Sequence, residues 1–260
     1  MFIPYVGIPK TLKVKKMLLN YLEPSYQIGS FTIHLYGALL AIGIIIGLFV
    51  ARKLASERNI KSDYLYELAI ICIFAGIIGA RLLSLALHPQ NLLQDPWSIF
   101  SLHEGGLAAF GGLAGGIAAG LLYARWRQIS FWTIADVVAP SLALGEAITR
   151  LGCDVYGYAS PAAPFPRIVN GIPHHNIPLY TFLATATIFI ILWKMRANLV
   201  GGRLFLTYLL LYGGSRLFID YFRGEHLFLS LINLAQGGSL LIALLALLFL
   251  TLFSKKPVTK

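Results

Sequence analysis

Seven stretches of this chain are dominated by apolar residues, and each is long enough to cross a lipid bilayer. A transmembrane helix needs about 20 mostly apolar residues. We therefore predict membrane-spanning helices over residues 32–51, 65–87, 106–124, 131–149, 177–194, 204–222 and 228–253. Helices satisfy their backbone hydrogen bonds internally, as lipid requires. The alternating segments of a membrane β-barrel are absent from the sequence. The pattern predicts an all-α integral membrane protein, a bundle of about seven transmembrane helices.

The composition supports this class. The chain is 57% hydrophobic and only 12% charged, whereas about 25% of residues in soluble domains are charged. Its formal net charge of +10 is accounted for by basic cytoplasmic loops and by anionic membrane lipid. We therefore expect no nucleic-acid partner.

The distribution of Lys and Arg predicts the orientation. With the N-terminus outside, twelve basic residues fall inside: Arg52, Lys53, Arg58, Lys61, Arg125, Arg127, Lys194, Arg196, Arg203, Lys255, Lys256 and Lys260. Eight fall outside: Lys10, Lys13, Lys15, Lys16, Arg150, Arg167, Arg216 and Arg223. The loop 88–105 has neither Lys nor Arg. We predict the N-terminus outside and the C-terminus inside.

The same pattern divides the chain into three parts. Residues 1–31 form a basic N-terminal segment without a cleavable signal pattern. This segment is either a short interfacial amphipathic segment or a frayed tail. Residues 32–253 form the transmembrane domain, and residues 254–260 form a basic cytoplasmic tail.

Three arginines lie within or at the edge of apolar stretches: Arg81, Arg150 and Arg216. A charge near the bilayer centre costs about 2.5–3.5 kcal/mol on insertion scales, so it needs a partner or a water-filled cavity. In the predicted orientation, Arg150, Arg216, Arg223 and Glu104 all lie toward the outer leaflet. This convergence predicts a polar chamber that holds an anion, and a lipid phosphate is the obvious one.

Helical spacing groups some of these charges. Arg216, Asp220 and Arg223 are four and three residues apart and share one helix face. The alternative to anion binding is a salt-bridge ladder in which Arg223 extends toward the headgroups. Glu146 and Arg150 are also four apart. Arg150 offers a bidentate fork for phosphate, and the alternative is a structural Glu146–Arg150 pair.

Several other residues are candidates for a weaker reason. Tyr36 is either an interfacial anchor or a phenol that donates to phosphate or to a lipid ester. Arg81 is either part of the anion site or a partner for a carboxylate such as Asp136. His103 and Glu104 are the one histidine–acid pair that could move a proton.

Glycines are concentrated around the third predicted span. Gly112, Gly116 and Gly120 are four apart and predict close approach of another helix. The earlier pairs, Gly105–Gly106 and Gly111–Gly112, are expected to form a loop whose free N–H groups hold an anion.

Taken in order, these pieces resemble the prolipoprotein diacylglyceryl transferase family. The resemblance extends from Tyr36 to about Gln236 and is carried by a series of short motifs. They are His34-Leu-Tyr36-Gly37, Gly79-Ala-Arg81, Glu104-Gly-Gly-Leu-Ala-Ala-Phe110-Gly-Gly, Ala135-Asp136 to Pro140, Leu144-Gly145 to Arg150-Leu-Gly152, His175 to Tyr180, and Arg216 to Arg223.

The resemblance implies transfer of the diacylglyceryl group of phosphatidylglycerol to the lipobox cysteine of prolipoprotein signal peptides. The product would be a thioether, and glycerol phosphate would leave. By similarity, Arg150 and Arg216 match two arginines tied to headgroup binding and catalysis, and Tyr36 matches a functionally important tyrosine. Asp220 stands where the family usually has glutamate. The implied location is the bacterial cytoplasmic (inner) membrane, as a multi-pass protein, and no cofactor or metal is implied.

The chain departs from the family pattern at two places. Phe110 stands where the family often has histidine and sometimes tyrosine. After Arg150 the usual Gly-Asn-Phe-x-Asn-x-Glu is replaced by Gly152-Cys153-Asp154-Val-Tyr156-Gly157-Tyr158. We interpret Cys153 as filling the Asn position within the substrate site. A base would then be sought at His103–Glu104 or Asp154.

Three hypotheses follow for function. The first is a lipid-to-protein transferase whose catalytic candidates are Arg150, Arg216, Tyr36, Glu104 and His103. Its substrate-binding candidates are Arg150, Arg216, Arg223, Asp220, Arg81, Gly111, Gly112 and Cys153. The second is a related transferase with another acceptor or donor. The third is a small transporter or lipid-binding protein, although the paired interrupted helices of many transporters are absent from the sequence.

Overall fold

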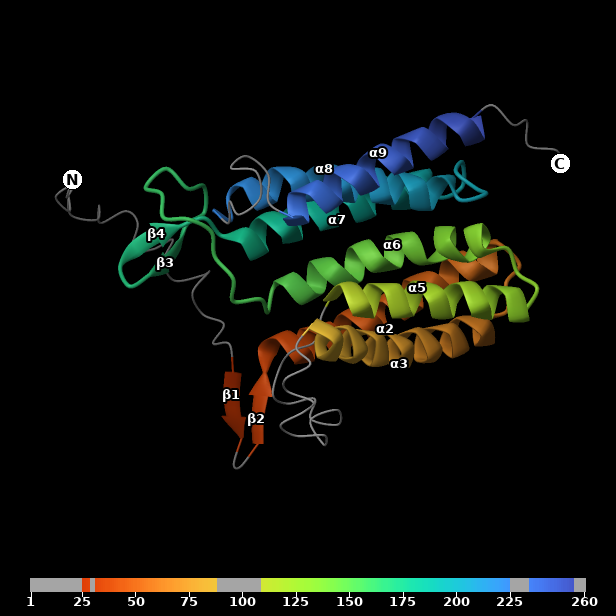
Figure 1. The fold of residues 1–260 in the computed structure, drawn as a ribbon, viewed down its shortest axis with the longest axis horizontal. Helices are drawn as coiled ribbons and strands as arrows, with labels where there is room; N and C mark the ends of the chain where they lie inside the picture. The colour runs from red at the N-terminus through yellow and green to blue at the C-terminus, as the bar shows by residue number, and fades with distance from the viewer. Residues whose placement is uncertain (1–24, 29–30, 88–108, 225–233, 255–260) are drawn as a thin grey trace. The chain divides into compact units, whose positions relative to one another are not determined.

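The computed structural model describes residues 25–28, 31–87, 109–224 and 234–254 (Figure 1). These residues form seven α-helices: α2 (Leu35–Glu57), α3 (Ser62–Leu87), α5 (Ala109–Trp126), α6 (Phe131–Arg150), α7 (Ile177–Met195), α8 (Arg203–Tyr221) and α9 (Leu234–Ser254). Two short antiparallel hairpins accompany them: β1 (Ser25–Ile28) with β2 (Phe31–His34), and β3 (Arg167–Val169) with β4 (Ile172–His174).

Each predicted span overlaps one helix, so the helical class is confirmed. Four helices in the described part of the chain are long and apolar enough to cross a membrane: α2, α3, α6 and α7. The prediction of an all-α chain was wrong in detail, because it contained neither hairpin. Residues 32–34, expected to be helical, pair with Ser25–Gln27 as strands. Strands this short satisfy backbone polar groups only locally and do not cross a bilayer.

The chain forms two compact units. The smaller unit comprises residues 48–138, and the larger unit comprises residues 1–47 and 139–260. The boundary between the units falls within α2 and within α6, so each of these helices has one part in each unit.

In the smaller unit, α3 packs along α5 through glycines. A Cβ at Gly79 would clash with the Gly111 carbonyl, and one at Gly115 would clash with the Ala75 carbonyl. The predicted close-approach face was therefore misplaced by one residue. Gly112 does lie close to Gly76, but a Cβ added at Gly116 or Gly120 would be in ordinary contact with Cys72, at 3.8 Å.

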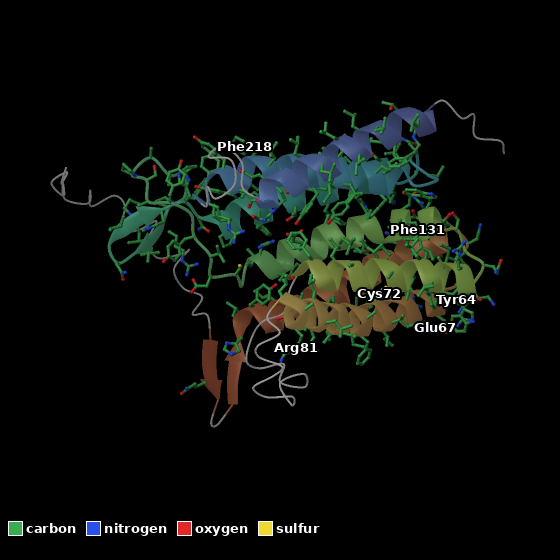
Figure 2. All side chains as sticks on the ribbon, viewed as in Figure 1. Tyr64, Glu67, Cys72, Arg81, Phe131 and Phe218 are labelled. Atoms are coloured by element: carbon green, nitrogen blue, oxygen red, sulfur yellow. The ribbon has the colours of Figure 1, made fainter. Side chains whose placement is uncertain are left out.

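Polar contacts also hold the smaller unit. Arg58 donates to the fully buried carboxylate of Asp136 at 3.0 Å, which joins the end of α2 to the start of α6. Near the opposite end of α3 from Arg81 (Figure 2), Glu67 accepts hydrogen bonds from Tyr123 and Arg127 of the α5 end. The Arg127 guanidinium also lies over the rings of Tyr64 and Trp126. This Arg–Glu–Tyr cluster links the start of α3 to the end of α5.

In the larger unit, the first half of α2 packs on the second half of α6, and α8 packs on α7 and α9 (Figure 1). A Cβ at Gly43 would lie 2.7 Å from the Gly145 carbonyl oxygen. A Cβ at Gly213 would lie 2.7 Å from the Ser239 carbonyl oxygen. These small residues allow backbones to approach closely, as is common between membrane helices. The C-terminal ends of α6 and α8, where the candidate arginines lie, both belong to this unit.

Candidate active site

Arg150 is the last residue of α6 and is held by Glu146, one turn earlier on the same face. Its Nε and Nη2 atoms lie 3.2 Å and 2.8 Å from the same carboxylate oxygen, Glu146 Oε1. The two side chains are 27% and 19% exposed. The structural Glu146–Arg150 pair, which was the alternative interpretation of this spacing, is present. Because both bonds use the Nε–Nη2 edge of the guanidinium, the N–H groups of Nη1 point elsewhere and are oriented by this anchor.

Tyr212 connects this pair to a second helix. Its hydroxyl, on α8, donates to Glu146 Oε1 across 3.1 Å. One carboxylate oxygen thus accepts from two nitrogen atoms of Arg150 and from one phenol. The contact fixes the end of α6 against α8 at the level of the arginine.

Arg216 follows Tyr212 by one turn of α8 and has its own carboxylate partner. Its Nη2 lies 3.1 Å from Asp220 Oδ1, and Arg223 Nη1 lies 4.0 Å from the same oxygen. The side chains of Arg216 and Asp220 are only 14% and 1% exposed. The shared face predicted for Arg216, Asp220 and Arg223 is confirmed.

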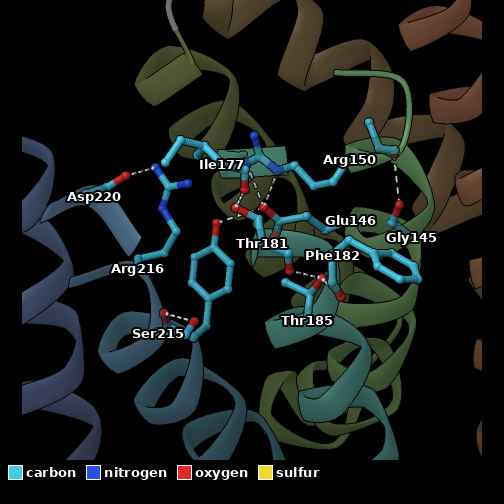
Figure 3. Close-up of polar contacts among 12 residues, drawn as sticks. Gly145, Glu146, Arg150, Ile177, Thr181, Phe182, Thr185, Ser215, Arg216 and Asp220 are labelled. Atoms are coloured by element: carbon cyan, nitrogen blue, oxygen red, sulfur yellow. Dashed lines mark hydrogen bonds and ion pairs between the residues drawn. The ribbon is translucent and has the colours of Figure 1, made fainter. Parts of the chain in front are cut away.

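The two arginine pairs meet around Tyr212. Figure 3 shows Arg150 and Arg216 reaching toward the same region from α6 and α8. Both guanidinium groups are near enough to interact electrostatically with the Tyr212 phenol. Three arginines and two carboxylates leave one excess positive charge in this cluster, which is defined by Glu146, Arg150, Tyr212, Arg216, Asp220 and Arg223. Such a cluster is suited to a singly charged phosphodiester.

A loop that follows α6 packs on the end of α8. Tyr158 donates its backbone N–H to the Phe222 carbonyl at 3.1 Å, and Gly157 donates to the His175 carbonyl at 2.8 Å. A Cβ at Gly157 would clash with the Phe222 carbonyl, so glycine permits this approach. The His175 ring lies against the rings of Tyr158 and Phe222. These contacts hold the chain next to Arg223.

His175 is buried, and burial lowers its pKa. The hydroxyl of Tyr180 donates to the Pro164 carbonyl at 2.6 Å. Since a phenol has one proton, the Nδ1 of His175, 3.2 Å from that hydroxyl oxygen, acts as the donor to it. The His175 ring therefore carries a proton on Nδ1. Asn176 then begins α7, accepting from Leu179 N–H at 3.2 Å.

Two further candidates lie near this cluster. Cys153 has a free, partly buried thiol that interacts electrostatically with Arg150. Tyr36 is about half exposed in the first turn of α2. The backbone of neighbouring Leu35 approaches Gly152, so this turn lies beside the chain that follows Arg150.

The remaining candidates lie elsewhere or outside the described residues. Arg81 is buried in α3 of the smaller unit. The loop expected at Gly111 and Gly112 was wrong, because both lie in the first turns of α5 and face α3. The side chain of Phe110 is 65% exposed. His103 and Glu104, with Gly105–Gly106, lie outside the described residues.

Tyr212 was missed at the sequence level, and Glu146 was considered only as a partner of Arg150. The available signal was spacing: Tyr212, Arg216 and Asp220 recur every four residues along one face. Among the described residues, no group of three or more His, Cys, Asp and Glu side chains could hold a metal ion.

Comparisons with known proteins agree with the resemblance seen in the motifs. Residues 24–252 match the family model for prolipoprotein diacylglyceryl transferase. Three relatives are named phosphatidylglycerol–prolipoprotein diacylglyceryl transferase. The Bacillus cytotoxicus protein is 31% identical over 86% of this chain and 89% of its own length. The Oceanobacillus iheyensis protein is 31% identical over 90% and 88%, and the Bacillus velezensis protein is 32% identical over 87% and 90%. The chain belongs to the prolipoprotein diacylglyceryl transferase family.

Proposed function

We propose that this protein transfers the diacylglyceryl group of phosphatidylglycerol to a cysteine thiol of prolipoproteins. The observation that carries the proposal is the meeting of Arg150 and Arg216 around Tyr212 and Glu146. Family membership supplies the reaction, since the relatives carry this activity in their names.

In this reaction the cysteine sulfur forms a bond to the terminal glyceryl carbon, and the bond from that carbon to a phosphate oxygen breaks. Glycerol phosphate leaves with the electron pair, and the thiol proton passes to a base or to water. Negative charge therefore accumulates on the departing phosphate. Guanidinium groups held in place before the reaction stabilise that charge without reorganisation.

We assign separate tasks to the arginines of this cluster. Arg150 and Arg216 bind the phosphate oxygens, each oriented by the carboxylate one turn away. Arg223, more exposed at the end of α8, attracts the headgroup from the membrane surface. Nearby cations also favour the thiolate form of the incoming cysteine.

The family-derived roles of the remaining candidates belong to the same proposal. Tyr36 contacts the lipid headgroup or ester from α2, and Cys153 lines the site beside Arg150. Asp154 is a poor choice of base because its carboxylate is engaged by Arg167, which leaves His103–Glu104 as the preferred proton acceptor.

The proposed topology has seven membrane crossings, with the N-terminus outside and the C-terminus inside. The turns at 58–61, 127–130 and 196–202 join successive helices and carry basic residues, which supports their cytoplasmic placement. The cluster then faces the outer leaflet of the bacterial cytoplasmic membrane. The signal peptide, carrying its lipobox cysteine, reaches it from that leaflet.

A related transferase with another acceptor is the second candidate. It is favoured by the run Gly152-Cys153-Asp154, in which Asp154 binds Arg167 of the β3–β4 hairpin. Incubation of the purified protein with labelled phosphatidylglycerol and a lipobox peptide separates the two. We expect the peptide mass to rise by one diacylglyceryl group. Label transfer only to another thiol would favour the second candidate, and no transfer would defeat both.

A further inference from the structure

Glu146 contacts residues of both helices that carry the candidate arginines. Its Oε1 atom accepts three hydrogen bonds, two from Arg150 on its own helix and one from Tyr212 on α8. Asp220, in contrast, pairs with Arg216, one turn earlier on α8, and with Arg223, three residues later in the chain. Glu146 therefore links two segments, whereas the ion pairs of Asp220 stay within one.

The geometry orients both partners of Glu146. The carboxylate occupies the Nε–Nη2 edge of Arg150, so the N–H groups of Nη1 point away from Glu146. The phenol of Tyr212 donates its single proton to Glu146, so its oxygen can only accept hydrogen bonds from other partners. The Oε1 atom of Glu146 thus orients both the Arg150 guanidinium and the Tyr212 hydroxyl.

We propose that Glu146 is a positioning residue for the transfer reaction, holding Arg150 and Tyr212 in the arrangement that receives the phosphate. The role presupposes the transferase activity proposed above. Glu146 does not contact the substrate. It acts through Arg150 and Tyr212, and small displacements of such groups reduce turnover by up to about a hundredfold.

The protein contains a matched control for this role. Glu67 in the smaller unit also accepts from a tyrosine and an arginine, Tyr123 and Arg127, which lie at the end of a neighbouring helix. Glu67→Leu and Glu146→Leu thus remove the same chemical cluster from two places. A merely structural role would make the two variants similar in activity.

The test measures kcat and KM for phosphatidylglycerol in the wild type, Glu146→Leu, Glu146→Gln, Tyr212→Phe, Glu146→Leu/Tyr212→Phe and Glu67→Leu. We expect kcat to fall about tenfold or more in Glu146→Leu, with partial recovery in Glu146→Gln, whose carbonyl accepts the same bonds. Adding Tyr212→Phe to Glu146→Leu should cost less than it does in the wild type, because contacting residues are coupled. Glu67→Leu should retain wild-type kcat.

Melting curves and gel filtration in detergent establish that each variant is folded. If Glu146→Leu fails to fold, the conservative Glu146→Gln and Tyr212→Phe carry the test through their own kcat values. Wild-type kcat in Glu146→Gln and Glu146→Leu, or independent losses for Glu146→Leu and Tyr212→Phe, would overturn the proposal. An inactive wild type would instead defeat the transferase activity itself.

Discussion

The hydroxyl of Tyr212 donates to Glu146 across 3.1 Å, and this contact joins the helix that ends at Arg150 to the helix that carries Arg216. Residues more than 60 positions apart in the sequence therefore share one polar cluster. A cluster of this kind amid apolar helices is costly unless its charges are paired. The six named residues of the cluster carry three positive and two negative charges.

Removal of the Arg150 guanidinium should nearly abolish transfer. Loss of one preorganised donor to a developing anion costs about 100- to 1,000-fold in kcat. We expect a loss of this size for Arg150→Ala, and Arg150→Lys should recover little because an ammonium group cannot form the bidentate fork. The measurement is diacylglyceryl transfer to a lipobox peptide by mass spectrometry. Full activity of a folded Arg150→Ala would be incompatible with the assignment.

Neutralisation of Asp220 should destabilise the larger unit. The carboxylate is almost fully buried and faces Arg216 and Arg223. Removing one partner of a buried ion pair costs about 3–5 kcal/mol, because the remaining charge is left uncompensated. Asp220→Asn should therefore lower the melting temperature in detergent, whereas Thr187→Ala, which loses only a surface hydroxyl bond on α7, should not. Equal melting temperatures would contradict the buried pairing.

The close approach of α3 and α5 should tolerate no side chain at Gly79. A Cβ there would clash with the Gly111 backbone, which cannot rotate away as a flexible side chain could. Gly79→Ala should lower the melting temperature. The control is Gly237→Ala on α9, where an added Cβ has nothing within 4 Å and alanine is the better helix former. A stable Gly79→Ala would show that the two backbones are farther apart.

Stability should fall as the pH drops below about 6.5, the ordinary pKa of histidine. Burial lowers the pKa of His175 in the folded protein, so the unfolded chain binds a proton first. The contribution of His175 to the free energy of unfolding is fully present above its pKa in the unfolded chain. This contribution is lost as the pH falls through its lower pKa in the folded protein. The melting temperature should decline less between pH 7.5 and 5 in His175→Phe than in the wild type. An identical decline in the variant and the wild type would show that His175 does not contribute to the pH dependence of stability.

Substitution of Phe110 should change activity little. Its ring is largely exposed on the first turn of α5, and it can neither accept nor donate a proton. Phe110→Ala should therefore act only through packing, with an unchanged dependence of kcat on pH. A shifted pH profile would mean that this position takes part in proton transfer.

The sequence predicted the helices well, because apolar runs of helical length have few alternatives in a membrane protein. It predicted the hairpins poorly. Asn170 and Gly171 both have positive φ, as a two-residue hairpin turn requires, yet the flanking strands Arg167–Val169 and Ile172–His174 are too short to give a clear alternating pattern. The Asn-Gly pair was the available signal.

The site was predicted in part. Spacing along one helix gave the Glu146–Arg150 and Arg216–Asp220 pairs, which are local. The Tyr212–Glu146 contact depends on how α6 and α8 are rotated, which no single-sequence pattern encodes. The same dependence on rotation explains why the glycine face of α5 was misplaced, with Gly111 and Gly115 in tightest contact instead of Gly116 and Gly120.

The most direct measurement compares kcat/KM for phosphatidylglycerol in Arg150→Lys, Arg216→Lys and the double variant. If both guanidinium groups bind one phosphate, they act as a unit and their losses are strongly non-additive. We predict that the double variant loses much less than the product of the two single losses. Losses that multiply independently, or wild-type kcat/KM in either single variant, would contradict a shared phosphate site.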